Sequence, residues 1–417
     1  MRSVAVFVTS ALSIALTAGF GLGLWLLLAR VWGVTLFGAN WLALVQVHGL
    51  LQLFGFAGLF AMGVALHAIP RFRGAPMVRL RLVWTIYLAT LAGLAFRGIA
   101  QPIYQLPGRG TALALSGVLL LVGTGLFAAT ILRTLATGRN PHRADELLMG
   151  AGITVLPIAA LLVAFEMLGS APTNVDQVTD DRAIWVMLLG SLTTLILGVW
   201  ARLSPGFIAS VPAKPLPLLG GAAAWLIGVA FLGVGIPGGA WLMLAGLAAI
   251  TLATGLFGTS IARQRLTGHA ALTRVGVRSA FAWAFVGLAI LGLESGGVAT
   301  SYLQVSAARH AFALGFVTLM IYSVGSRALP AFLGLGRWNA RLQVLTLALA
   351  NLAVAARVGP QLLEIGGPVG DAVVGLSGLL ACAALVLFVT NVVRSALGPA
   401  AQAPGASVPI QLTFRPR

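Results

Sequence analysis

Apolar residues recur along this chain in runs long enough to cross a lipid bilayer, and short polar or basic stretches separate the runs. A membrane-spanning helix needs about 20 apolar residues. The pattern predicts an all-α integral membrane protein with twelve transmembrane helices, at about 4–29, 44–69, 79–100, 110–133, 147–169, 183–207, 216–236, 240–262, 275–295, 304–329, 341–362 and 371–394. Residues 1–417 would form a single membrane domain with 396–417 as a loose C-terminal tail.

The twelve runs are organised as three copies of one unit. A glycine lies fifteen residues before a proline three times, in the pairs Gly55 and Pro70, Gly190 and Pro205, and Gly315 and Pro330. Each proline has a basic or potentially basic residue three positions before it and a phenylalanine two positions after it: His67 and Phe72, Arg202 and Phe207, and Arg327 and Phe332. Such self-similarity predicts three repeats of four helices, about 1–140, 141–270 and 271–395, related by pseudo-threefold symmetry.

Composition and charge agree with a multi-pass membrane protein. The chain is 59% hydrophobic and 8% charged, and its formal net charge is +17. With the N-terminus in the cytoplasm, twenty lysines and arginines fall on the cytoplasmic side and six on the other. This positive-inside bias predicts a bacterial inner-membrane protein with both termini cytoplasmic and in contact with anionic lipids, rather than a nucleic-acid-binding protein. The single cysteine, Cys382, excludes a disulfide framework and a Cys-rich metal site.

Two histidines lie at similar membrane depth in corresponding helices of copies one and three. His48 lies seven residues before Gly55, and His310 lies five residues before Gly315. Gln52 lies between His48 and Gly55 at helical spacing, so these three residues share one helix face. Two such histidines can hold a haem iron from both sides, and the glycines would let the flat macrocycle lie against backbone. The alternative is a pair of unrelated interfacial histidines that bond to loop carbonyls.

Two arginines follow the distribution of the histidines. Arg97 and Arg357 each lie 27 residues after the proline of their copy, whereas copy two has Leu232 there. Copy two also has Ala183 and Trp185 where the other copies have histidine. Because arginine binds carboxylates bidentately, Arg97 and Arg357 are predicted to meet the two haem propionates. The alternative is ordinary snorkelling of both side chains to the membrane surface.

A third membrane histidine, His67, lies 19 residues after His48. That separation corresponds to about 28 Å along a helix, so the two cannot share one metal. We interpret His67 as a cap at the cytoplasmic end of its helix. A copper site formed by His67 with Met62 is the alternative.

The remaining ionisable candidates carry weaker signals. Glu166 and Glu294 lie near extracytoplasmic helix ends, where they are candidate partners for the arginines of that side. His142 and His269 fall in predicted cytoplasmic loops beside arginines, and we interpret both as solvated residues.

These residues carry a family resemblance. Twelve helices in three groups of four, with a histidine in helix 2 and another in helix 10, resemble the catalytic subunit of haem–copper oxidases and nitric oxide reductases, in which those helices hold the low-spin haem. The segment His48–Phe56 (HGLLQLFGF), which continues to Gly63 and Pro70-Arg-Phe72, and the later segment Arg309–Gly315 (RHAFALG) look more like the NnrS family. That resemblance implies a membrane protein of the nitric oxide response that binds haem, here haem b, and copper.

The chain departs from the oxidase pattern where a second metal would bind. Helices 6 and 7 contain no histidine, and helix 10 has His310 alone. We therefore predict a haem-binding protein of the NnrS type that protects against or responds to nitric oxide, and whether it is an enzyme stays open. A transporter or channel without haem is one alternative, and a nitric oxide or oxygen reductase that takes electrons from quinol or cytochrome is another. The electron donor and the oligomeric state are not indicated.

The charge asymmetry predicts where fusion reporters will be active. A reporter fused after Asp176 is expected to read as periplasmic, and one fused at Arg417 as cytoplasmic, because the cytoplasmic side retains most of the arginines. Paired alkaline phosphatase and fluorescent-protein fusions measure this. The reverse pattern would overturn the orientation.

Overall fold

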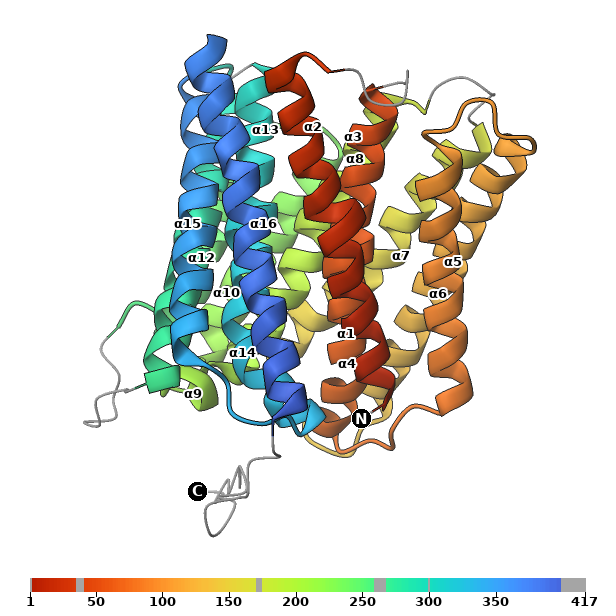
Figure 1. The fold of residues 1–417 in the computed structure, drawn as a ribbon. Helices are drawn as coiled ribbons and strands as arrows, with labels where there is room; N and C mark the ends of the chain where they lie inside the picture. Colours follow the sequence, from red (N-terminus) through yellow and green to blue (C-terminus); the bar gives the residue numbers. More distant parts are fainter. Residues whose placement is uncertain (1, 35–40, 170–174, 259–267, 299–300, 399–417) are drawn as a thin grey trace.

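The structure, a computed structural model, describes residues 2–34, 41–169, 175–258, 268–298 and 301–398 (Figure 1). Those residues form helices and no strands. The first group is α1 (Arg2–Ile14), η1 (Ala15–Gly19), α2 (Phe20–Trp32), α3 (Trp41–Leu50), η2 (Leu51–Gly58), α4 (Leu59–Arg73), α5 (Leu80–Ala100) and α6 (Arg109–Thr137). The second is α7 (Asp145–Gly169), α8 (Gln177–Trp185), η3 (Val186–Thr193), α9 (Thr194–Ile208), α10 (Pro215–Gly233) and α11 (Gly239–Ala253). The third is α12 (Gly268–Ser295), α13 (Tyr302–His310), η4 (Ala311–Thr318), α14 (Leu319–Leu333), α15 (Ala340–Leu362) and α16 (Gly367–Leu397).

Consecutive elements stack end to end into longer helices, here called rods, and the described residues contain one rod at each of the twelve predicted transmembrane positions. Eleven of these rods are long and apolar enough to span a membrane. The exception is α11, which was predicted to continue to residue 262 but ends at Ala253 after 15 residues. Gly255 takes a left-handed conformation with φ +62°, which ends the helix. The predicted C-terminal tail lies outside the described residues beyond Gly398. The start of α1 and the end of α16 lie at the same end of the bundle (Figure 1).

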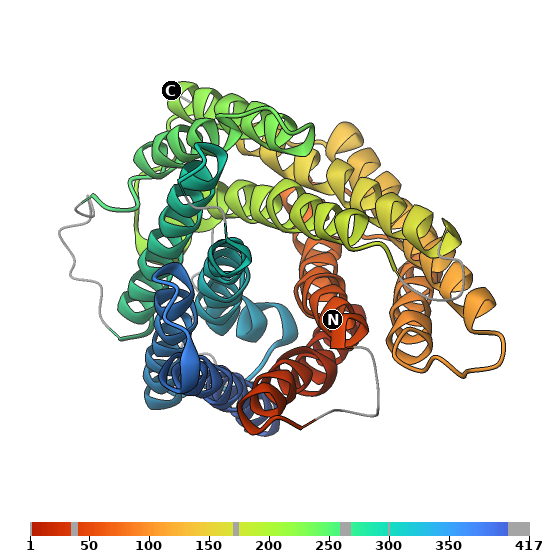
Figure 2. The same ribbon diagram turned by 90° about the horizontal axis from the view of Figure 1, so that it is seen from above.

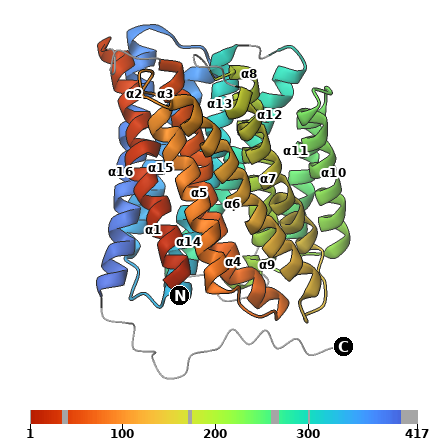
Figure 3. The ribbon, with the colours of Figure 1, turned by 90° about the vertical axis from the view of Figure 1, so that its right-hand side faces the viewer.

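Three rods form the inside of the molecule: α3–η2–α4, α8–η3–α9 and α13–η4–α14. In the most apolar windows of these three, 78%, 78% and 83% of the residues are buried, against at most 56% in the other spans. Seen from above, they surround the centre, and most of the other helices lie outside them (Figure 2). The pair α10 and α11 lies at one edge of the bundle (Figure 3).

Each inner rod widens into a π-helical segment at the same place. The repeated glycine is the fifth residue of η2, η3 and η4. A side chain at Gly55, Gly190 or Gly315 would come within 2.8 Å or less of a neighbour on α1, α7 or α12, respectively. The repeated glycine therefore lets each inner rod pack tightly against the first helix of its own copy. Such π-helical segments are rare and frequently occur at functional sites.

Contacts between copies follow a cyclic order at the lower end of the bundle as drawn in Figure 1. The guanidinium of Arg202 lies 5.3 Å from the ring of Phe72, and that of Arg327 lies 5.2 Å from the ring of Phe207. The imidazole of His67 completes the cycle, 4.9 Å from the ring of Phe332. Both arginines also donate to the backbone carbonyl of the phenylalanine that they cover. These contacts agree with the predicted triplication, although twelve-helix threefold symmetry itself stays a prediction.

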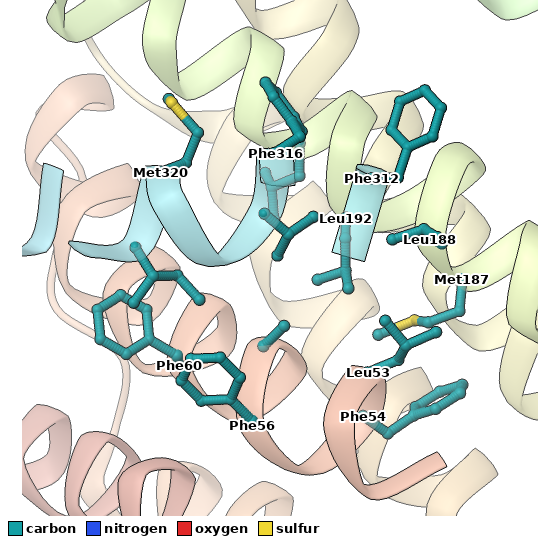
Figure 4. Packing of buried hydrophobic residues seen from close by; sticks show 14 of the residues in the cluster. Leu53, Phe54, Phe56, Phe60, Met187, Leu188, Leu192, Phe312, Phe316 and Met320 are labelled. Carbon is teal, nitrogen blue, oxygen red and sulfur yellow. The ribbon is translucent and has the colours of Figure 1, made fainter. Parts of the chain in front are cut away.

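Apolar side chains fill the space between the inner rods. Figure 4 shows this packing, with Phe56 and Phe60 from one rod, Leu188 and Leu192 from the second, and Phe316 from the third. Where helices approach each other most closely, glycine is required. A side chain at Gly152 on α7 would lie 2.6 Å from the backbone nitrogen of Leu195.

We expect Gly152→Ala to destabilise the protein by about 1–3 kcal/mol, because the added methyl group meets backbone atoms that cannot rotate away. The matched control is Gly220→Ala on α10, where no heavy atom lies within 4 Å. That change should leave the stability unchanged or raise it by up to about 1 kcal/mol. Thermal unfolding of the purified protein in one detergent measures both. Equal effects of the two changes would contradict the close packing of α7 against α9.

Candidate functional site

A cavity of about 260 Å³ lies in the upper half of the bundle as drawn in Figure 1, the end predicted to be extracytoplasmic. Residues from all three inner rods form it, the second rod contributing through α8 alone, together with α2, α15 and α16. Both His48 and His310 line it, from α3 and α13. The structure thus brings together two histidines that are separated by more than 260 residues of sequence.

The imidazole of His48 is held through one nitrogen. Its Nδ1 lies 2.9 Å from the carbonyl oxygen of Gly19. Gly19 ends the π-helical segment η1, and its ψ of −103° departs from helical geometry. Gly23, one turn further, gives the ring its space, because a side chain there would lie 2.6 Å from Cε1 of His48. A histidine whose Nδ1 donates to a carbonyl has its Nε2 lone pair available for a metal.

His310 is held in the same way by its own helix. Its Nδ1 lies 2.7 Å from the carbonyl oxygen of Ser306 and 3.4 Å from the hydroxyl of that residue. The amide of Gln361 donates to the same hydroxyl at 3.3 Å. Within the part of the chain that the structure describes, neither His48 nor His310 has a hydrogen-bond partner at Nε2. Both rings therefore present a nitrogen with the character of a metal ligand at the cavity that they share.

Arg357 lies in the cavity wall, and no described carboxylate forms an ion pair with it. Its Nε and Nη1 atoms are buried and have no hydrogen-bond partner among the described residues. A buried guanidinium without an anion is costly, so an unpaired one indicates a missing anionic partner. The other arginines of the wall are paired, Arg309 with Asp181 at 3.3 Å and Arg30 with Asp371 at 3.1 Å.

The remaining wall combines apolar side chains with three further buried polar atoms that lack a hydrogen-bond partner among the described residues, on Gln52, Arg309 and Gln361. Phe20, Leu24, Leu27, Phe56 and Val317 contribute apolar surface. Gln52 also lines the cavity, and its buried Oε1 has no hydrogen-bond partner in the described structure. Apolar walls, two imidazoles and a free guanidinium match the apolar ring, the iron and the carboxylates of a haem, so the residues present fit the group.

Two predicted neighbours of the macrocycle lie elsewhere. Neither Gly55 nor Gly315 is in the cavity wall. A side chain at Gly55 would point toward Ile14, and one at Gly315 toward Trp283, both on adjacent helices. The glycine that gives His48 room is Gly23, whose spacing in the sequence carries no repeat signal. Only the folded chain shows that α2 crosses α3 at this point.

Arg97 also lies apart from its predicted place. It is fully buried behind the cavity wall, where it pairs with Asp180 at 2.6 Å and Glu166 at 3.3 Å. Its Nε donates to Gln101, whose amide in turn donates to Gln46 at 2.6 Å. Asp180 and Gln46 line the cavity, but Arg97 does not. Arg97 and Arg357 therefore have equivalent positions but different surroundings. Copy two places two carboxylates, Glu166 and Asp180, beside Arg97, whereas no described carboxylate pairs with Arg357.

The helix that carries Asp180 and Asp181 has a well-defined start. Asp176 caps α8 by accepting bonds from the hydroxyl and the backbone nitrogen of Thr179 at 2.7 and 2.9 Å. These two bonds, with the hydroxyl as the larger cause, hold the pKa of Asp176 below its ordinary value. The cap fixes the first turn of α8, so Asp180 and Asp181 reach Arg97 and Arg309.

Other candidate residues are distant from the cavity. His67, predicted to cap the cytoplasmic end of its helix, is buried, and its ring packs against that of Phe332. His269, predicted to be solvated, packs against Trp338 at 6.3 Å, whereas His142 is largely exposed and bonds to Glu146. Glu294 is half-buried and is not in the cavity wall. Over the described ranges, no group of three or more His, Cys, Asp or Glu residues is arranged to hold a metal ion.

Comparisons with known proteins agree on family and fold. The family model described as NnrS protein matches residues 10–399. A comparison with curated proteins gives no match. Among solved structures, a haem–copper terminal oxidase dimer seen by cryo-electron microscopy has a TM-score of 0.60 and 12% sequence identity, over 96% of this chain and 85% of that chain. At that identity the similarity shows a fold like that of the oxidase and nothing about chemistry.

We expect Arg97→Gln to destabilise the protein by about 3–5 kcal/mol, because it removes the guanidinium that compensates two buried carboxylates. The control is Arg30→Gln, which breaks a pair whose side chains are 55% and 33% exposed and should cost no more than about 1 kcal/mol. Chemical unfolding in detergent compares the variants. A small effect of Arg97→Gln would contradict its role as a buried structural pair.

Proposed function

Because this chain belongs to the NnrS family, as the match over residues 10–399 establishes, we propose that it is a haem-binding membrane protein that protects against or responds to nitric oxide. The family resemblance read from the short segments around His48 and His310 is confirmed by that match. The oxidase-like fold is compatible with a haem-type cofactor, and the residues of the cavity argue for one. Haem b is the form that we propose.

One observation carries the proposal: the imidazoles of His48 and His310 line one cavity, and each is fixed at Nδ1 by a backbone carbonyl. Metal-binding histidines characteristically have their second nitrogen fixed in this way. Two unrelated interfacial histidines would have no reason to line the same cavity. That alternative is therefore less well supported than a haem iron that both histidines would hold.

Arg357 supports the orientation of the group. A haem held by both histidines has two carboxylates, and the buried Nε and Nη1 atoms of Arg357 lack a partner within the described structure. Arg309 and Arg30 also line this end of the cavity. We propose that the propionates point to this end, toward the predicted extracytoplasmic surface, and that Arg357 compensates one of them.

The protein's own residues would perform three tasks. His48 and His310 would hold the iron in their neutral forms, Arg357 would compensate negative charge, and the apolar wall would exclude water from the ring. When bound, haem would supply one-electron redox chemistry. Copper at His67 stays a prediction, and so does catalytic turnover.

We also propose the finer architecture that the sequence predicts. The chain would be one membrane domain of three four-helix repeats, with both termini in the cytoplasm of a bacterial inner-membrane protein. The cyclic contacts of His67, Arg202 and Arg327 support this arrangement. Copies one and three would then have kept the haem ligands, whereas copy two has Trp185 in the place equivalent to His310.

Replacement of either proposed haem ligand is expected to remove low-spin haem. His48→Ala and His310→Ala should each abolish the sharp α and β bands of the reduced protein, because the iron would lose one of the two imidazoles that hold it. The control is His142→Ala, whose side chain is 70% exposed and distant from the cavity. Absorbance spectra of the purified protein after reconstitution with haem measure the result.

Arg357→Gln in the same series should weaken haem retention without changing the ligation bands, because Arg357 contacts the periphery of the group and not the iron. Unchanged low-spin bands in both histidine variants would overturn the ligand assignment. A parent protein that stays colourless after reconstitution would overturn haem binding and favour the transporter alternative.

A further inference from the structure

A second cavity of about 90 Å³ lies at the centre of the molecule, between α4, α9 and α14. Its lining contains no charged group and, apart from the indole of Trp200, no polar side chain. It is continuous in its lining with the first cavity, since Ala57 and Val317 belong to both walls. We name it the axial cavity.

The axial cavity is built from equivalent positions of the three copies. Six positions, counted from the repeated glycine, contribute one residue from each inner rod: Ala57, Leu192 and Val317; Phe60, Leu195 and Met320; Ala61, Ile196 and Ile321; Val64, Val199 and Val324; Ala65, Trp200 and Gly325; and Ala68, Leu203 and Ala328. Ile69 is the one lining residue without counterparts in the wall. Figure 4 labels three of these lining residues, Phe60, Leu192 and Met320.

The space exists because the copies differ in side-chain size. Copy one contributes four alanines at these positions, and copy three contributes Gly325 and Ala328. Copy two contributes larger residues at the same places, including Trp200 and Leu203. Ala61, Val64 and Val324 remain half-exposed although they lie on the most buried rods, because their side chains face the cavity. Small residues in two copies have thus left a void that bulky equivalents would fill.

Water is a poor occupant of this void. A buried water molecule needs two to four polar partners, and empty apolar cavities stay dry yet bind apolar guests such as xenon. A cavity needs a volume of about 10–15 Å³ to accommodate one water-sized molecule. The axial cavity, at about 90 Å³, therefore has room for several small molecules.

We propose that the axial cavity binds small, uncharged, apolar gas molecules, of which nitric oxide is one, and passes them to the haem cavity past Ala57 and Val317. Such molecules concentrate in the membrane interior, and the cavity lies at membrane depth beneath the histidines. The nitric oxide part of this inference rests on the proposed function. The existence of an apolar gas site does not, because it depends on the lining alone.

Xenon is the probe, because it is apolar, uncharged and close in size to the expected guests. Crystals of the full-length protein under xenon pressure should show an anomalous peak between α4, α9 and α14, and xenon NMR of the detergent-solubilised protein should show saturable binding. Ala61→Phe should abolish both signals by filling the space. The control, Ala223→Phe, adds the same ring on an exposed face of α10 and should change neither.

A second filling variant keeps the test decisive if Ala61→Phe misfolds. At Gly325 an added side-chain carbon meets its nearest neighbours at 3.4 Å or more, so Gly325→Val should fold and still reduce xenon binding. Absence of xenon from the parent, or binding that survives Gly325→Val, would overturn the axial site. Haem binding is measured separately, from the absorbance spectrum. Loss of the haem proposal would therefore leave the xenon result standing, and loss of the xenon site would leave the haem result standing.

Discussion

The constraint on which this structure depends is the absence of water from the bilayer core. Every backbone and side-chain polar group at membrane depth must find its partner within the protein. Helices satisfy the backbone, and the described side chains mostly follow: Trp225 donates to Thr194, and Asn351 accepts from Trp283. Against that background an unsatisfied group is informative. Arg357 stands out because it is charged and buried, and its Nε and Nη1 atoms have no hydrogen-bond partner among the described residues.

The predicted copies share one packing pattern, and differences between their equivalent positions form the cavities. The repeated glycine packs each inner rod against the first helix of its own copy, and the cyclic contacts tie the rods together at the other end. Within that frame, copies one and three contribute histidines above and small side chains below. Copy two contributes bulk at the centre, with Trp200, and the carboxylates that pair with Arg97. The two cavities are thus products of the same asymmetry between equivalent positions.

Arg97 and Arg357 show how equivalent positions acquire different roles. Both are arginines at matched places, but Arg97 meets Glu166 and Asp180, whereas the Nε and Nη1 atoms of Arg357 meet no described partner. A buried ion pair costs desolvation that its own attraction roughly balances, and it fixes the position of the helices that carry it. Arg97 therefore holds α5, α7 and α8 together behind the cavity. Arg357, with its charge uncompensated, faces the cavity itself.

The sequence by itself determined the elements of this protein: the all-helical membrane class, the repeated spacing and the two histidines, because hydrophobic run length and helical spacing are local properties. The sequence also contains the six sets of equivalent residues that line the axial cavity, and they can be recognised once Gly55, Gly190 and Gly315 are aligned. The tertiary structure alone decided which residues meet. Gly19 accepts a hydrogen bond from His48, Gly23 leaves space for its ring, and Asp180 forms an ion pair with Arg97. These contacts join helices that are separate in the sequence. Helix crossing and side-chain direction create those contacts, and neither is encoded in the spacing along one chain.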